Sequence, residues 1–236
     1  MNGMFAIFIG DPTYYLYLLP GLLLGIFAQM RLTSTYSKYM NTGLESGMTG
    51  AEAARTILDR AGLQNVAINV VPGHLTDHYD PTKKELFLSE ENYQSRSISA
   101  VGVAAHEAGH ALQHKAAYAP LHMRMAMVPV TNIATQASMF IFFGGIFLGL
   151  MKMALLAVAI YGIVALFQLI TLPVEYDASR RAKQQLLESG IVNRNEAGAV
   201  SSVLSAAALT YVAALVSAVV TLLYWISLVN RSNNRS

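Results

Sequence analysis

The chain has 236 residues, of which 54% are hydrophobic and only 13% are charged. Soluble domains carry about 25% charged residues, so this composition excludes an ordinary soluble globular protein and a disordered chain. The net charge of +2, without any basic run, excludes a nucleic-acid-binding protein. The absence of cysteine excludes disulfides, thiolate metal ligands and a cysteine nucleophile.

The apolar residues gather in blocks long enough to cross a bilayer, which takes about 20 residues of helix. The first block runs from Tyr14 to Met30 and contains Pro20, which membrane helices tolerate. A cleavable signal peptide is the alternative, but the segment lacks a basic start and a small-residue cleavage site. We therefore expect residues 1–30 to contain a first membrane span.

The second apolar block, residues 129–172, is too long for one span. Lys152 is its only charge, which predicts a hairpin of two helices, 129–150 and 153–173, that turns at Lys152. The last block, residues 206–229, ends in aromatic residues typical of a membrane interface. The sequence therefore predicts a mainly α-helical integral membrane protein with four spans.

The basic residues divide unevenly between the polar parts of the chain. All but three of the 16 lysines and arginines lie in residues 31–125 or 174–205, and the exceptions are Lys152, Arg231 and Arg235. Because cytoplasmic loops carry the excess of Lys and Arg, we expect both polar regions in the cytoplasm and both termini outside.

The larger polar region is expected to contain two helices. Thr49 and Glu52 form the pattern of a capping box, which predicts a helix through about Ala61 that stops at Gly62. A second helical pattern runs from Ser97 to about residue 117.

Two short strands are expected between these helices, at residues 66–71 and 85–89. They could pair as a hairpin with a long loop, so the region is predicted to be α+β with a small β-hairpin or sheet. The predicted division of the chain has six parts. The first segment with the first span is 1–30, the larger polar region is 31–125 and the span hairpin is 129–173. The second polar region is 174–205, the last span is 206–229 and the disordered tail is 230–236.

The pattern that carries chemistry is His106-Glu107-Ala108-Gly109-His110, in the second predicted helix. Residues four apart share one face of a helix, so both imidazoles can reach one zinc ion. Glu107 can then act as the general base, taking a proton from water at the open position of the metal and passing it to the leaving amine. Small residues at 108 and 109 leave room for close packing behind the site.

A zinc site of this kind needs a third protein ligand. The metzincin pattern is excluded, because Gln113 and Ala116 stand where it requires Gly and His. His114 and His122 are expected to face solvent or an interface instead.

A carboxylate is the better candidate for the third ligand. The acids after His110 are Glu175, Asp177, Glu188 and Glu196. Glu175 stands beside Pro173 where the third span emerges, and a carboxylate against the bilayer is costly and usually functional. Asp177 points about 200° away from Glu175 on a helix and is expected to pair with Arg181.

The His106–His110 motif, the stretch from Pro173 to Ala182 and the stretch from Asp77 to Ser89 together resemble the YugP-type bacterial membrane zinc metallopeptidases, over nearly the whole chain. That family is more distantly similar to HtpX-type and CAAX-processing proteases. In those proteases an Asp follows the Glu ligand by four residues, whereas this chain has Ser179 there.

The resemblance implies a gluzincin, a metallopeptidase in which zinc is bound by His106, His110 and Glu175 and in which Glu107 is the base. A second group would help to stabilise the oxyanion of the transition state. The spacing does not choose among the candidates, which are His74, His78, Tyr79, Tyr176 and Arg180. Residues 85–89 could offer a strand edge to an extended substrate.

We therefore expect a zinc endopeptidase of the cell membrane that cuts proteins or peptides at the cytoplasmic face. A homo-oligomer or a regulatory membrane partner is compatible with the sequence. One alternative is a site-2-type intramembrane protease, which the polar residues after His110 disfavour. Another is a non-catalytic metal-binding scaffold or transporter subunit, which would have no need of Glu107.

Overall fold

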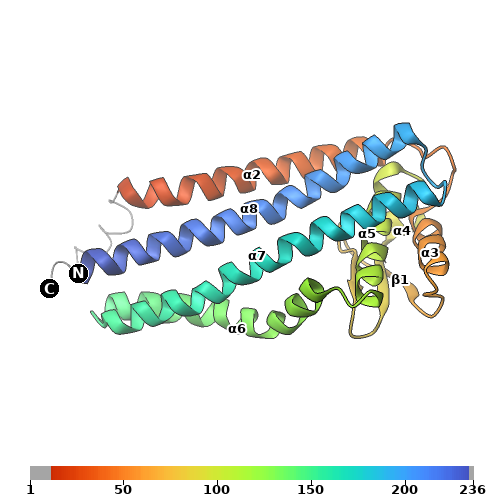
Figure 1. The fold of residues 1–236 in the computed structure, drawn as a ribbon. Helices are drawn as coiled ribbons and strands as arrows, with labels where there is room; N and C mark the ends of the chain where they lie inside the picture. The colour runs from red at the N-terminus through yellow and green to blue at the C-terminus, as the bar shows by residue number, and fades with distance from the viewer. Residues whose placement is uncertain (1–11, 234–236) are drawn as a thin grey trace. The chain divides into compact units, whose positions relative to one another are not determined.

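The computed structural model describes residues 12–233, and Figure 1 labels its helices and strand β1. The chain is mainly helical and divides into two compact units. Of the described residues, 12–27, 123–172 and 210–233 form an apolar unit, and 28–122 and 173–209 form a polar unit. Residues 1–11 and 234–236, which include parts of the predicted first segment and tail, lie outside the described residues.

Among residues 12–233, four helices are long and apolar enough to cross a membrane, which agrees with the predicted number of spans. They are α2 (Pro12–Met40), α6 (Ala119–Phe147), α7 (Met151–Glu188) and α8 (Arg194–Asn233). Each extends beyond its apolar block on at least one side, because helical hydrogen bonding continues through polar residues before or after the block. The described part of the predicted disordered tail, residues 230–233, is likewise helical.

The predicted turn of the α6–α7 hairpin is displaced by a few residues. Helix α6 ends at Phe147, and Gly149 takes a positive φ of 68° that glycine adopts without strain. Lys152 is therefore the second residue of α7 and not the turn itself.

The core of the apolar unit is aromatic. Phe142 of α6 stacks on Trp225 of α8, with 4.0 Å between the ring centroids and 7° between the ring planes. Gly21 of α2 lies so close to Ser217 of α8 that an added Cβ would stand 2.8 Å from the serine Oγ. Small residues at such contacts let membrane helices approach closely.

The polar unit is built around two helices, α3 (Gly50–Arg60) and α5 (Ile98–Lys115), which pack against each other (Figure 1). Helix α3 begins at the predicted capping box, with the Thr49 hydroxyl accepting from the Glu52 amide and the Glu52 carboxylate accepting from the Thr49 amide. It ends before Gly62, whose φ is +71°. Buried aliphatic side chains such as Ile57, Leu58 and Val101 fill the core between these helices.

The strands form a three-stranded sheet in the order β1-β3-β2, where β1 is Ala67–Val71, β2 is His78–Asp80 and β3 is Glu85–Ser89. The predicted hairpin of the two longer strands is wrong, because β1 and β3 are parallel. The short strand β2, which the sequence did not reveal, pairs antiparallel with β3. The Asp80 side chain stabilises the β2–β3 turn by accepting from the amides of Thr82 and Lys83.

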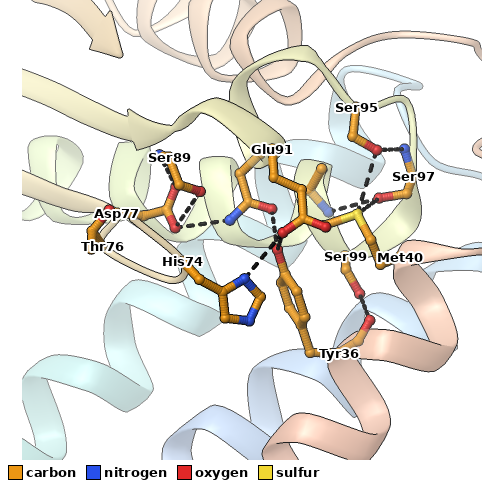
Figure 2. Close-up of polar contacts among 12 residues, drawn as sticks. Tyr36, Met40, His74, Thr76, Asp77, Ser89, Glu91, Ser95, Ser97 and Ser99 are labelled. Atoms are coloured by element: carbon orange, nitrogen blue, oxygen red, sulfur yellow. Dashed lines mark hydrogen bonds and ion pairs between the residues drawn. The ribbon is translucent and has the colours of Figure 1, made fainter. Parts of the chain in front are cut away.

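A polar cluster at the end of β3 fixes the point where β2 begins (Figure 2). Asp77 accepts hydrogen bonds from the Ser89 amide and hydroxyl and from Asn92 in α4 (Glu90–Gln94). Asn92 accepts in turn from the hydroxyl of Tyr36 at 2.8 Å. Because Asp77 is held at the carboxyl end of β3 and directly precedes β2, the chain runs back along β3 and β2 pairs with it antiparallel.

This order also overturns the expectation of a free substrate-binding edge at residues 85–89. Strand β3 is the central strand, and β1 and β2 occupy its two sides. The inward side chains Leu86 and Leu88 are fully buried, so β3 is part of the core.

Candidate metal centre

Ser97 caps the start of helix α5, with its hydroxyl accepting from the Ala100 amide, and the helix carries His106 and His110 on one face. The helix lies against α7 at Gly109, where an added Cβ would stand 2.6 Å from the carbonyl oxygen of Ala178. Ala108 is fully buried beside it. The small residues of the motif therefore allow the close packing that the sequence predicted.

The contact between the helices brings His106, His110 and Glu175 together, with one donor atom from each within 4.8 Å of the others. Glu175 Oε2 lies 3.2 Å from His106 Nε2 and 3.7 Å from His110 Nε2. Glu175 is only 1% exposed, and the two imidazoles are largely buried. Among residues 12–233 this is the one group of three or more histidine, aspartate or glutamate residues that could hold a metal ion.

The other ring nitrogen of each histidine has its own partner. Nδ1 of His106 lies 3.1 Å from the Ser179 hydroxyl, and Nδ1 of His110 lies 3.0 Å from Oε1 of Gln113. Both Nε2 atoms therefore face Glu175. Such outer hydrogen bonds orient metal-binding histidines and select their tautomer.

The electrostatics of the site favour a cation. Burial by itself lowers the pKa of the His110 imidazole, but the hydrogen bond with Glu175 and the charges of Glu175 and Glu107 outweigh it. The pKa of His110 therefore lies above its ordinary value. Glu107 is buried, with 8% of its surface exposed, and its charge acts on the same imidazole.

The three side chains fit zinc by donor type and by spacing. Two imidazole nitrogens and a carboxylate oxygen are common ligands of catalytic zinc, which leaves one coordination position for water or substrate. Tetrahedral coordination at about 2.0–2.1 Å places neighbouring donor atoms about 3.3 Å apart. The separations from the carboxylate oxygen, 3.2 and 3.7 Å, are close to that value.

The other predicted histidines are placed elsewhere. His114 Nδ1 lies 2.9 Å from the Tyr79 hydroxyl, and the His114 ring contacts that of His122. His114 is half-buried. Burial is the main cause that lowers the pKa of its imidazole, and the charges of His122 and Lys84 lower it further. Its contacts differ from the solvent or interface position expected for it, whereas His122 is exposed.

The candidates for oxyanion stabilisation also have other contacts. His74 binds the Glu91 carboxylate, and the His78 ring stacks on Phe87. Tyr176 is 51% exposed, and Arg180 pairs with Asp177. No choice among these candidates follows from the contacts, so this part of the sequence analysis stays a prediction.

Asp177 contacts residues beside the metal centre. Asp177 does pair with Arg181, at 2.6 Å, as predicted. It also accepts a hydrogen bond of 3.0 Å from Gln113, the residue that contacts His110. In the sequence, Gln113 and Ser179 stand out only as departures from the patterns of other families. The signal that could have found them is their spacing, because Gln113 follows His110 by three residues and Ser179 follows Glu175 by four.

The comparison with known proteins agrees with this geometry. A family model described as "Putative neutral zinc metallopeptidase" matches residues 14–230, and the chain belongs to that family. Membership of this metallopeptidase family and the four apolar helices of residues 12–233 together indicate a membrane protein.

The curated protein "Putative membrane protease YugP" of Bacillus subtilis (strain 168) is 47% identical to this chain over 203 residues. The match covers 86% of this chain and 90% of that protein. The resemblance that the sequence motifs indicated is thereby confirmed. No solved structure matches the chain.

Proposed function

We propose that this protein is a zinc-dependent endopeptidase of the gluzincin type, which hydrolyses peptide bonds of proteins or peptides at the cytoplasmic face of the cell membrane. The observation that carries the proposal is the convergence of His106, His110 and Glu175, with both Nε2 atoms directed to the carboxylate. The buried carboxylate of Glu107 next to this group supplies a base.

Metal binding and proton transfer are carried out by different residues. His106, His110 and Glu175 would hold zinc, which when bound supplies a Lewis acid that polarises the peptide carbonyl and lowers the pKa of water. Glu107 accepts the proton of the attacking water and donates it to the leaving amine. Burial of the carboxylates strengthens these interactions by excluding competing water.

The alternatives are less well supported. A site-2-type protease carries its histidine motif in a membrane span, but the four candidate spans in the described chain do not include α5. Helix α5 instead contributes to the core of the polar unit. A metal-binding scaffold would have no need of a buried carboxylate directly after the first ligand.

The cytoplasmic location rests on the distribution of charge and on the order of the spans. His106 and Glu175 must lie on one side of the membrane to share a metal, and the α6–α7 hairpin between them crosses the bilayer an even number of times. The excess of Lys and Arg in the same regions selects the cytoplasmic side.

The test is the substitution Glu107→Gln in the full chain, purified in detergent. Glutamine has the shape of glutamate but cannot accept the proton, so we expect zinc content to be kept and cleavage of casein to fall by about 10²–10⁴-fold. Glu188→Gln, the same change at an exposed glutamate of α7, is the matched control and should retain activity. Cleavage by Glu107→Gln at the rate of the unsubstituted chain would refute the proposed mechanism.

A further inference from the structure

A chain of buried polar groups continues from the metal centre through Gln113. This glutamine is fully buried, and its side-chain amide makes contacts at both ends. Oε1 lies 3.0 Å from His110 Nδ1, while Nε2 lies 2.8 Å from the Val174 carbonyl and 3.0 Å from Asp177 Oδ2. A polar side chain this deeply buried is costly unless its hydrogen bonds are made, and here they are made to specific partners.

The partners of Nε2 determine which way the amide points. A backbone carbonyl and a carboxylate can only accept hydrogen bonds, so the NH₂ end of Gln113 must face Val174 and Asp177. The oxygen end must then face His110. An oxygen can only accept, so Nδ1 of His110 carries the proton and Nε2 presents its lone pair to the metal position.

The two anchors of the amide lie on either side of the carboxylate ligand. Val174 directly precedes Glu175 in α7, and Asp177 follows it by two residues. The Gln113 side chain of α5 therefore contacts α7 on both sides of Glu175, and it also contacts His110. Asp177 is itself held by Arg181 Nε at 2.6 Å and by Arg180.

We propose that Gln113 and Asp177 are positioning residues that set the tautomer of His110 and its placement relative to Glu175. We call this link from Asp177 through Gln113 to His110 the relay. It rests on the proposed function, because it takes His110 and Glu175 as metal ligands. Because the central group is an amide, which neither gains nor loses a proton in this range of pH, the relay transmits orientation and not a proton. Asp177 acts only through Gln113.

The test compares metal binding by the full-length protein in detergent for Gln113→Met, Asp177→Ala and the double variant. Methionine matches glutamine in length but makes none of its hydrogen bonds. We expect Gln113→Met to weaken zinc binding about 10–100-fold, the effect usual for loss of an outer hydrogen-bond partner. Zinc affinity is measured by competition with a chromophoric chelator, and ligand geometry by the visible spectrum of the cobalt-substituted protein.

The double variant distinguishes a relay from two separate contributions. If Asp177 acts through Gln113, the double variant should bind zinc no more weakly than Gln113→Met alone. Asp177→Asn keeps an oxygen that accepts from Gln113, and it should restore most of the affinity lost in Asp177→Ala. Losses that multiply in the double variant, or an Asp177→Asn variant as weak as Asp177→Ala, would overturn the proposal.

Two controls match the chemical changes. Gln64→Met replaces an exposed glutamine, and Asp59→Ala removes an acid that pairs with Arg55 four residues away, as Asp177 pairs with Arg181. Both should bind zinc like the unsubstituted chain. If that chain itself binds no zinc, the proposed function fails; if it binds zinc and Gln113→Met binds equally well, only the relay fails. Should Gln113→Met not fold, the pair Asp177→Ala and Asp177→Asn decides.

Discussion

Glu175 is the residue on which the metal centre depends most. Its carboxylate is almost completely buried and is the shared partner of both histidines. The two histidines come from α5, and Glu175 adds a ligand from α7. A buried carboxylate is stable only when it has such partners. Without metal the partners are the two imidazoles, and with metal the partner is the cation.

Replacing Glu175 by alanine should therefore abolish zinc retention. We expect a loss greater than the 10–100-fold caused by removing a group that only orients a ligand. Elemental analysis after dialysis measures this, with Glu188→Ala as the control at an exposed position of the same helix. Full zinc retention by Glu175→Ala would show that another carboxylate is the ligand.

At the scale of elements, the contact between α5 and α7 sets the distance between the ligands. Gly109 lies one residue before His110, and its Cα faces the carbonyl of Ala178. Gly102, in the same helix, has ordinary space, because an added Cβ would stand 3.6 Å from the nearest atom of Val200. The two glycines therefore give a matched pair for substitution by alanine.

We expect Gly102→Ala to stabilise the protein by about 0.5–1 kcal/mol, since alanine loses less backbone freedom than glycine in a helix. Gly109→Ala should instead destabilise it by about 1–3 kcal/mol through overpacking against the Ala178 backbone, and should weaken zinc binding. Thermal unfolding and zinc competition measure both effects. Equal behaviour of the two variants would mean that the close contact at Gly109 is unimportant.

The capping box of α3 gives a second prediction at this scale. Thr49→Ala should cost about 1 kcal/mol, whereas Thr56→Ala in the interior of the same helix should not. Hydrogen bonds from the Thr49 amide and, second, from the Thr49 side chain lower the pKa of the Glu52 carboxyl, and alanine removes the side-chain contribution. Because the folded pKa is lowered, the contribution of Glu52 is present above the unfolded pKa and is lost as the pH falls through the folded pKa. The effect of Thr49→Ala on unfolding should accordingly shrink in acid.

At the scale of the whole molecule, the arrangement of the four spans can be tested directly. The chain has no cysteine, so single cysteines can be introduced without background labelling. We expect Lys152→Cys, at the start of α7, to react with an impermeant reagent in intact cells. Ser46→Cys, in the exposed segment before α3, should react only after lysis. The reverse pattern would place the metal centre outside the cell.

Much of this protein follows from local patterns in its sequence. The four apolar helices, the capping box at Thr49 and the pair of histidines on one face of α5 depend on residues close together in the chain. Their physical causes, which are hydropathy, helix capping and helical periodicity, act over a few turns. Glu175 could be proposed because a carboxylate beside a membrane span is costly without a role.

The order of the sheet and the outer partners of the histidines were decided only by the tertiary structure. The contact of Asp77 with Ser89 accompanies the antiparallel pairing of β2 with β3, and no local pattern encodes that contact or the parallel pairing of β1 and β3. Gln113 meets Val174 and Asp177, 61 and 64 residues away, and Ser179 meets His106 across 73 residues. An amide and a hydroxyl are ordinary polar residues in the sequence. They acquire their significance only where the packing of α5 against α7 buries them beside the ligands and leaves them specific hydrogen-bond partners.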